Sequence, residues 1–252
     1  MSTTTNSTPL RTVSDRDFLI GSVWEGTGEE IHVNRHFANQ SEFGGRILSG
    51  ISGMLLTIAT FDPALLEGCP SRLEWAFNGA LLEGDRLKVS GARTGDGFTI
   101  EGRVGEAGAA RPTSAGRIEF GALSDARALA GTSTRGRTFT AADIDLFRSW
   151  FSPGASPPDK LVPWPMVVLL ASGLVSRSGY LGKHEMTLNR GFVWTFAGLP
   201  EVDDTLHCVY GPVHARGSNT RPDLTVGRYE VAVVSSVTGR VFATVDWTVM
   251  FR

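Results

Sequence analysis

The chain has 252 residues, which is enough for one large domain or for two domains of about 120 residues each. Its residues are 41% hydrophobic and 20% charged, which is typical of a globular protein and not of a disordered chain. The formal net charge of −2 offers no electrostatic basis for binding nucleic acid or an anionic membrane.

The first residues are predicted to form a loose tail rather than a targeting segment. Residues 1–9 are rich in Ser, Thr and Asn, and they lack the basic start and apolar stretch of a signal peptide. The longest apolar run, residues 161–174, is too short to span a bilayer and contains two prolines. Cys69 and Cys208 follow no metal or redox spacing, and so few cysteines are typical of a reduced compartment. We therefore expect a cytoplasmic protein that does not enter the membrane.

The first half of the chain reads as helices followed by strands. A helix is expected after Ser14, whose hydroxyl would cap a first turn rich in acidic residues. After a loop, an apolar helix is expected over residues 47–60. Strands over residues 86–93 and 98–104 flank a Gly/Asp turn, which indicates a hairpin. Residues 105–114 are small and flexible, so they are predicted to form a long turn.

The second half repeats this order after a linker at residues 126–136. Thr140 would cap its first helix, and an apolar helix is expected over about residues 166–177. Two strands with alternating apolar residues follow, over residues 226–236 and 240–251. Helices followed by antiparallel strands give an α+β layer in which a sheet folds round one buried helix.

Two sequence echoes indicate that the halves are diverged copies of one unit. An acidic helix start at Asp17 recurs at Asp143, an offset of 126 residues. A longer pattern recurs at an offset of 119 residues, so we predict one domain over residues 10–125 and a second over residues 137–252. The longer pattern is Trp75, Phe77, Gly79, Asp85 and Leu87, which corresponds to Trp194, Phe196, Gly198, Asp204 and Leu206.

The most specific motif begins at His32 and continues from Phe43 to Gly50. It resembles the active-site stretch of the MaoC-like (R)-specific enoyl-CoA hydratases and 3-hydroxyacyl-thioester dehydratases. That family's pattern is roughly Ser-Gly-Asp-x-Asn-Pro-Ile-His-x-Asp-x-x-x-Ala, followed by Phe-Gly-Gly-x-Ile-x-His-Gly at the central helix. The residues that match it in order are Ile31, His32, Ala38, Phe43, Gly44, Gly45, Ile47 and Gly50.

The resemblance implies a double hot-dog fold, with two tandem domains that each wrap an antiparallel sheet round a central helix. It also implies a lyase that adds water to a 2-enoyl thioester or removes water from a 3-hydroxyacyl thioester. Such chemistry needs a proton relay from His and carboxylate side chains, and N–H donors for the enolate oxygen at a helix start. In this chain His32 would be the acid/base and Gly50 the oxyanion donor, with no cofactor and no metal.

The motif departs from the family pattern at three places. The family's catalytic Asp falls on Thr27, and a threonine cannot act as a base near neutral pH. The family's Asn-Pro becomes Glu29-Glu30, and its second His becomes Ser49. A substitute carboxylate from Glu25, Glu29 or Glu30 is one hypothesis, with Glu29 favoured by its register, and solvated loop acids are the other.

The second half shows no equivalent of the His32 motif, so we expect it to be catalytically degenerate and to shape the acyl tunnel. The expected substrate-binding residues are Asn34, Phe43 and Ser49 in the first half. Trp164 in the second half would line the tunnel or pack in the core. His36 lies four residues after His32, a spacing found in metal sites, but no third ligand is evident in the sequence.

Three functions remain open at this point. The first is a hydratase or dehydratase of acyl groups carried on CoA or an acyl-carrier protein, in fatty acid or polyketide metabolism. The second is a His-only isomerase or cyclase acting on a polyketide-like intermediate. The third is a non-catalytic acyl-binding subunit that supports a catalytic partner. The resemblance implies either a homodimer or pairing with another hot-dog subunit.

Overall fold

The computed structural model describes residues 6–7, 10–26, 28–105, 110–151, 160–180 and 187–252. The two longest of the described helices each precede a run of strands. The described helices are α1 (Asp15–Ile20), a π-helix (Gly21–Glu25), α2 (Glu30–Val33), α3 (Arg35–Gln40), α4 (Gly50–Phe61), a 3₁₀ helix (Pro63–Leu66), α5 (Ala141–Phe151) and α6 (Trp164–Arg177).

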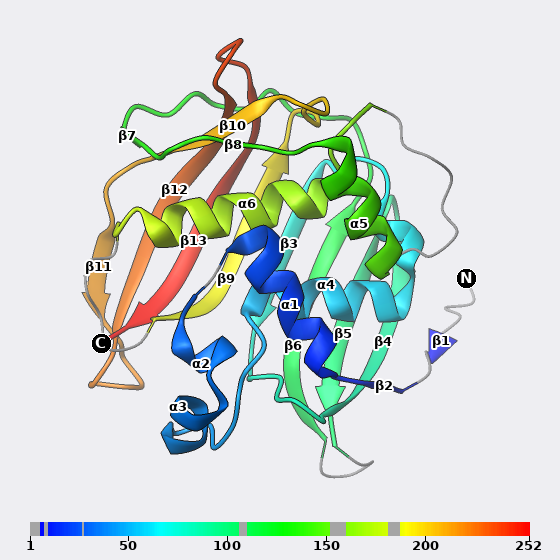
Figure 1. Ribbon diagram of the computed structural model, residues 1–252, viewed down its shortest axis with the longest axis vertical. Helices are drawn as coiled ribbons and strands as arrows, with labels where there is room; N and C mark the ends of the chain where they lie inside the picture. The colour runs from blue at the N-terminus through cyan, green and yellow to red at the C-terminus, as the bar shows by residue number, and fades with distance from the viewer. Residues whose placement is uncertain (1–5, 8–9, 27, 106–109, 152–159, 181–186) are drawn as a thin grey trace.

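The strands pair antiparallel into one continuous sheet, and α4 and α6 lie across one face of it (Figure 1). The first half contributes β1 (Asn6–Ser7), β2 (Arg11–Thr12), β3 (Arg72–Phe77), β4 (Arg86–Thr94), β5 (Gly97–Val104) and β6 (Arg111–Glu119). The second half contributes β7 (Thr132–Ser133), β8 (Arg137–Thr138), β9 (Thr187–Phe196), β10 (Thr205–Tyr210), β11 (His214–Gly217), β12 (Thr225–Ser235) and β13 (Val241–Phe251).

The two halves have the same strand order on either side of the sheet's centre. The order β4-β5-β6-β3 in the first half continues as β9-β13-β12-β10 in the second. β3 and β9 pair with each other, with Leu73 opposite Trp194 and Trp75 opposite Phe192. The two tryptophans of the sequence echo therefore lie on the equivalent central strands, which explains why that part of the repeat stays recognisable.

The two long helices are buried because apolar residues cover most of their surfaces. α4 begins at Gly50, and the Ser49 hydroxyl caps it by accepting a hydrogen bond from the Ser52 N–H at 3.2 Å. α6 begins at Trp164 with Pro165 in its first turn, where a missing N–H costs nothing. Every residue of α6 from Trp164 to Val175 is buried. Within the described part of the chain, no helix is both long enough and apolar enough to cross a membrane.

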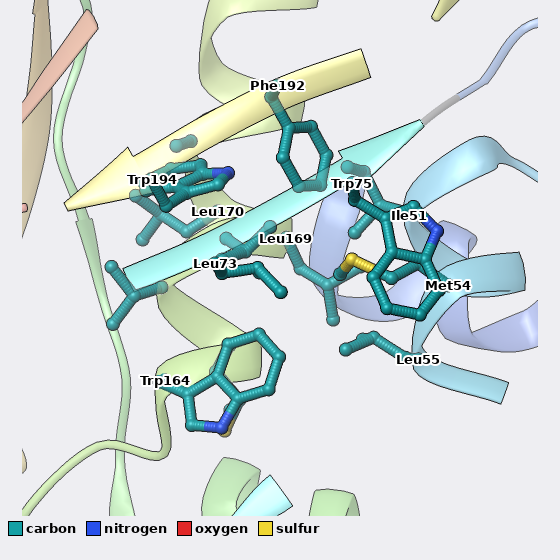
Figure 2. Packing of buried hydrophobic residues seen from close by; sticks show 14 of the residues in the cluster. Ile51, Met54, Leu55, Leu73, Trp75, Trp164, Leu169, Leu170, Phe192 and Trp194 are labelled. Carbon is teal, nitrogen blue, oxygen red and sulfur yellow. The ribbon is translucent and has the colours of Figure 1, made fainter. Parts of the chain in front are cut away.

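The core continues across the junction between the halves. Figure 2 shows side chains from α4, α6, β3 and β9 packed in one cluster. Trp164 is fully buried there, its Nε1 donates to the Leu65 carbonyl oxygen at 3.1 Å, and its ring meets Phe196 edge to face. The halves are thus joined by a shared core as well as by strand pairing.

Some predicted boundaries differ from the structure. Residues 47–49 precede α4 instead of opening it, because Ile47 bridges to Leu82 in an extended conformation. The turn predicted over residues 105–114 extends too far at its C-terminal end, because β6 already begins at Arg111. Residues 106–109 lie outside the described part. Within the predicted linker, β7 pairs with β10. The domain limits at residues 10–125 and 137–252 stay predictions.

Candidate active site

A cavity of about 960 Å³ is lined by residues of both halves. Its volume lies within the usual range for sites that bind small molecules. The first half contributes Glu25, His32, Ser49 and Gly50 to the lining, and the second half contributes Ser172 and Asn189. The cavity therefore brings the His32 motif together with side chains that are far away in the sequence.

The backbone at Glu25 is held in an unusual conformation against α6. The π-helix ends at Glu25, and Gly26 follows with a φ of 68°, a left-handed conformation that glycine adopts without strain. Arg177 of α6 donates from Nη1 to the carbonyl oxygens of Glu25 and Gly26, at 3.2 and 3.1 Å. A Cβ on Gly173 would lie 1.5 Å from the Glu25 carbonyl oxygen, so only glycine allows this approach.

The side chain of Glu25 is a buried carboxyl group held by one serine from each half. It is 2% exposed, and its Oε2 accepts a hydrogen bond from Ser49 Oγ at 2.7 Å. Its Oε1 accepts a hydrogen bond from Ser172 Oγ at 2.5 Å. Burial raises the pKa of Glu25 to about 7, and nearby Glu29 also raises it, whereas the Ser172 and Ser49 hydrogen bonds lower it. Glu25 can therefore exchange a proton near neutral pH.

His32 lies on α2 with its ring fixed by the main chain. Its Nδ1 lies 2.7 Å from the Ile47 carbonyl oxygen. Because a carbonyl can only accept, Nδ1 carries the hydrogen and Nε2 of the neutral ring keeps a free lone pair. Burial lowers the pKa of His32, while the Ile47 carbonyl and Glu29 act in the opposite direction. At neutral pH the ring is therefore an uncharged base.

The start of α4 supplies hydrogen-bond donors at the same cavity. The first N–H groups of a helix have no acceptor within that helix, and the helix dipole favours negative charge beside them. Asn189 of β9 faces this point, since its Nδ2 lies 3.3 Å from where a Cβ on Gly50 would be. Trp247 Nε1 donates to Asn189 Oδ1 at 3.0 Å, which turns the Asn189 NH₂ group away from Trp247.

The structure brings together some of the predicted site residues. His32, Phe43, Ser49 and Gly50 line the cavity together with Glu25, and Ser49 also donates a hydrogen bond to the Glu25 carboxylate. Glu29 lines it too, but its side chain is exposed and it stands at the N-cap of α2. The geometry therefore favours Glu25 over Glu29 as the substitute carboxylate.

Asn34, His36 and Trp164 are absent from the cavity lining. Thr27 is outside the described residues. Asn34 is exposed and caps α3, where its side chain accepts hydrogen bonds from the N–H groups of His36 and Phe37. Trp164 was expected either to line the acyl tunnel or to pack in the core. It belongs to the shared core and is absent from the cavity lining. His36 is exposed, and the described residues contain no cluster of three His, Cys, Asp or Glu side chains that could hold a metal ion.

Sequence reasoning missed the contribution of the second half. Ser172, Arg177 and Asn189 all come from that half, which was expected only to shape a tunnel. One signal was available, because the pair Ser52-Gly53 in α4 recurs as Ser172-Gly173 in α6. The offset of 120 residues nearly equals that of the tryptophan echo.

Comparisons with known proteins gave structural neighbours only. Neither a protein-family model nor a curated protein sequence matches the chain. A MaoC domain protein dehydratase from Chloroflexus aurantiacus superposes with a TM-score of 0.72 at 10% identity, covering 100% of this chain and 95% of that one. A Mycobacterium tuberculosis protein described as a double hot-dog gives a TM-score of 0.72 at 12% identity, with coverages of 100% and 97%.

A third solved structure, a MaoC-like dehydratase, gives a TM-score of 0.67 at 10% identity and covers 98% of both chains. The TM-scores and coverages establish the fold, and at such low identities they leave the chemistry to the residues of the site. The α+β double hot-dog predicted from the sequence is confirmed. The chain has the double hot-dog fold of the solved MaoC-like dehydratases.

Proposed function

We propose that the chain hydrates 2-enoyl thioesters, or dehydrates 3-hydroxyacyl thioesters, carried on CoA or an acyl-carrier protein. The observation that carries this proposal is the buried carboxyl group of Glu25, which lines one cavity with His32 and the start of α4. A carboxyl group, an imidazole and a helix N-terminus are the three groups that the reaction requires.

The acid and base roles follow from the two environments. Neutral His32 has Nε2 free to take a proton from water as the water oxygen bonds to the β-carbon. Glu25, with a pKa of about 7, is protonated in a large fraction of molecules and gives its proton to the α-carbon. The product gains one water, and a proton transfer from His32 to Glu25 through solvent restores the starting state. Dehydration reverses each step.

The thioester oxygen would lie at the start of α4. Negative charge develops on that oxygen as the enolate forms, and the Gly50 N–H at the start of α4 would donate to it. The Asn189 NH₂ group, oriented by Trp247, supplies a second donor from the other half. This arrangement would make both halves necessary for one site.

The carboxyl group also separates this proposal from its alternatives. A His-only isomerase or cyclase has no need of a second proton-transfer group, and a binding subunit has no need of a carboxyl group with a pKa near 7. Burying a carboxyl group is costly, and such a cost is typical of functional sites.

Hydration of crotonyl-CoA, followed by loss of enoyl absorbance, tests the proposal. We expect measurable turnover by the wild type and a loss of roughly 10²- to 10⁴-fold in His32→Ala. His36→Ala is the matched control, because His36 is exposed on α3 and should leave the rate unchanged. Equal rates for His32→Ala and wild type would refute the site. An inactive but folded wild type would favour the isomerase, cyclase or binding alternatives.

A further inference from the structure

Two residues of β6 that line the cavity have buried hydroxyl groups with no hydrogen-bond partner in the part of the chain that the structure describes. Thr113 and Ser114 are 2% and 3% exposed, and both line the cavity. Neither Thr113 Oγ1 nor Ser114 Oγ has a partner among the residues that the structure describes. Buried polar groups in proteins are nearly always hydrogen-bonded, so two neighbouring hydroxyl groups without partners in a binding cavity point to a ligand atom.

A β-bulge directs both side chains to the same face of the sheet. Neighbouring residues of a regular strand face opposite sides. Here Gly102 of β5 pairs with Ser114 and Arg103 pairs with Pro112, which leaves Thr113 as the extra residue. Bulges re-aim side chains in this way and occur often beside active sites.

Contacts with the helix side of the sheet show where the two hydroxyl groups lie. Ser114 is directly opposite Phe77 of β3, whose ring lies 3.3 Å from where a Cβ on Gly50 would be. A Cβ on Gly102 would lie 2.9 Å from Thr113 Oγ1, and 3.1 Å from Thr57 Oγ1 of α4. Thr57 itself is satisfied, because it donates to the Gly53 carbonyl oxygen at 2.8 Å. Because Gly102 has no side chain, the space beside Thr57 of α4 is open to the Thr113 hydroxyl group.

We propose that Thr113 and Ser114 bind a second oxygen atom of the acyl chain, a keto or hydroxyl oxygen beyond the β-carbon. The substrate class is then an oxygenated acyl thioester rather than a plain alkyl one. This inference rests on the proposed function for the position of the thioester. Because Ser114 and Gly50 both adjoin Phe77, the second oxygen lies within the first several carbons of the chain.

The chemistry of the two hydroxyl groups explains the selectivity. Each can donate one hydrogen bond, so a single keto oxygen can accept from both, and a substrate hydroxyl can donate to one and accept from the other. A plain alkyl chain has no atom that can accept or donate a hydrogen bond, so it would leave both groups unpaired. Sites that hydrogen-bond a substrate oxygen reject analogues that lack it far more strongly than apolar pockets reject an added oxygen.

The first experiment compares binding of unreactive probes to the wild-type protein. The probes are heptanoyl-CoA and its 4-, 5- and 6-oxo derivatives, with dissociation constants measured by calorimetry. We expect one oxo isomer to bind roughly 10- to 100-fold more tightly than heptanoyl-CoA. Equal binding of all four probes would overturn the inference.

The second experiment removes the hydroxyl groups in the double variant Thr113→Val, Ser114→Ala. The preference for the oxo probe should fall below about threefold, while heptanoyl-CoA binds as well as before or better. Thr94→Val is the matched control, since Thr94 Oγ1 is also buried without a partner among the described residues but lies outside the cavity lining. A preference that survives in the double variant would contradict the assignment.

These measurements do not depend on turnover. A preference for an oxo probe in a protein that hydrates no enoyl thioester would uphold the binding of an oxygenated acyl chain and reject the proposed reaction. Hydration of plain and oxygenated enoyl thioesters with equal kcat/KM would uphold the reaction and reject this inference. The thermal midpoint of the unliganded double variant should not fall, because neither hydroxyl group has a hydrogen-bond partner to lose among the described residues.

Discussion

The Ser172 hydroxyl donates a hydrogen bond to the carboxylate of Glu25 across 147 residues of sequence. Ser172 lies in the buried helix α6 of the second half, and Glu25 ends the π-helix that precedes the His32 motif of the first. A serine of the half without the His32 motif thus fixes a carboxylate of the half that contains the motif. This relationship makes the second half part of the proposed site and not only its support.

Removing the Ser172 hydroxyl should change how Glu25 titrates. Among the hydrogen bonds that lower the pKa of Glu25, the one from Ser172 is the largest contribution, so Ser172→Ala should raise that pKa further. We expect the alkaline limb of the hydration rate to move to higher pH and kcat to fall about tenfold, in line with the loss of a hydrogen bond to a charged group. The measurement is kcat and kcat/KM between pH 5 and 9.

The conservative variant distinguishes this positioning role from a structural one. Ser172→Thr keeps the hydroxyl and should restore the wild-type pH profile, whereas a merely structural defect would lower the rate equally at every pH. Ser178→Ala, at the C-cap of the same helix, removes a hydroxyl that donates to the Val175 carbonyl oxygen and should leave the profile unchanged. A wild-type profile in Ser172→Ala would contradict the role.

The wild-type pH profile should be bell-shaped. Hydration needs neutral His32, whose pKa is lowered below its usual 6.5, and protonated Glu25, whose pKa is about 7. The rate should therefore fall on the acid side as His32 gains a proton, and on the alkaline side above pH 7 as Glu25 loses one. A rate that stays constant from pH 6 to 9 would exclude Glu25 as the acid.

Stability should also depend on the protonation of Glu25. The folded protein binds this proton more tightly than the unfolded chain, because the pKa is about 7 instead of 4.5. The unfolding free energy therefore falls as pH rises between these values, by up to about 3 kcal/mol. Glu25→Gln cannot titrate, so its stability relative to wild type should increase from pH 5 to pH 8.

Urea unfolding at both pH values measures this difference. Glu30→Gln is the control, because Glu30 is exposed and should follow the wild type. An unchanged difference between Glu25→Gln and wild type at the two pH values would show that the carboxyl group is not perturbed in this way.

The close contact at Gly173 predicts a large effect of a single methyl group. In Gly173→Ala the new Cβ would meet the Glu25 carbonyl oxygen at 1.5 Å, which forces the two backbones apart. We expect a loss of roughly 3 kcal/mol in unfolding free energy, at the upper end of the usual cost of overpacking. The same displacement should also abolish most hydration activity.

Gly53→Ala is the matched control for stability, since it adds the same methyl group to the other buried helix. Its Cβ would meet only the end of the Leu81 side chain, at 3.2 Å. Alanine also favours a helix over glycine by about 1 kcal/mol, so this variant should stay within about 1 kcal/mol of wild type. Similar unfolding free energies for the two variants would contradict the described packing.

The fold could be predicted well because its signals lie in short stretches of sequence and one of them occurs in both halves. The tryptophan echo lies on β3 and β9, and alternating residues defined β12 and β13. The start of α4 was missed by three residues, because the apolar Ile47 and Leu48 read as helix although they pair with the loop at Leu81 and Leu82. Periodicity cannot distinguish a buried extended segment from the first turn of a buried helix.

The site was harder to predict because its parts meet only in the folded chain. Register favoured Glu29, whereas the π-helix turns Glu25 inward and leaves Glu29 exposed. Ser172 could be noticed only through the Ser-Gly pair that α4 and α6 share, and its role depends on the approach of α6 to Glu25 that Gly173 allows. Such long-range contacts follow from packing of the two halves and leave little trace in a single sequence.

The most direct test of the account is the kcat/KM for crotonyl-CoA hydration by wild type, Glu25→Gln and Glu29→Gln at pH 7. We predict a loss of about 10²-fold or more in Glu25→Gln, because glutamine fills the same space without a proton to give. Glu29→Gln should lose only a few-fold, since Glu29 acts on the site through its charge. A Glu25→Gln variant as active as wild type, or a greater loss in Glu29→Gln, would contradict the central claim.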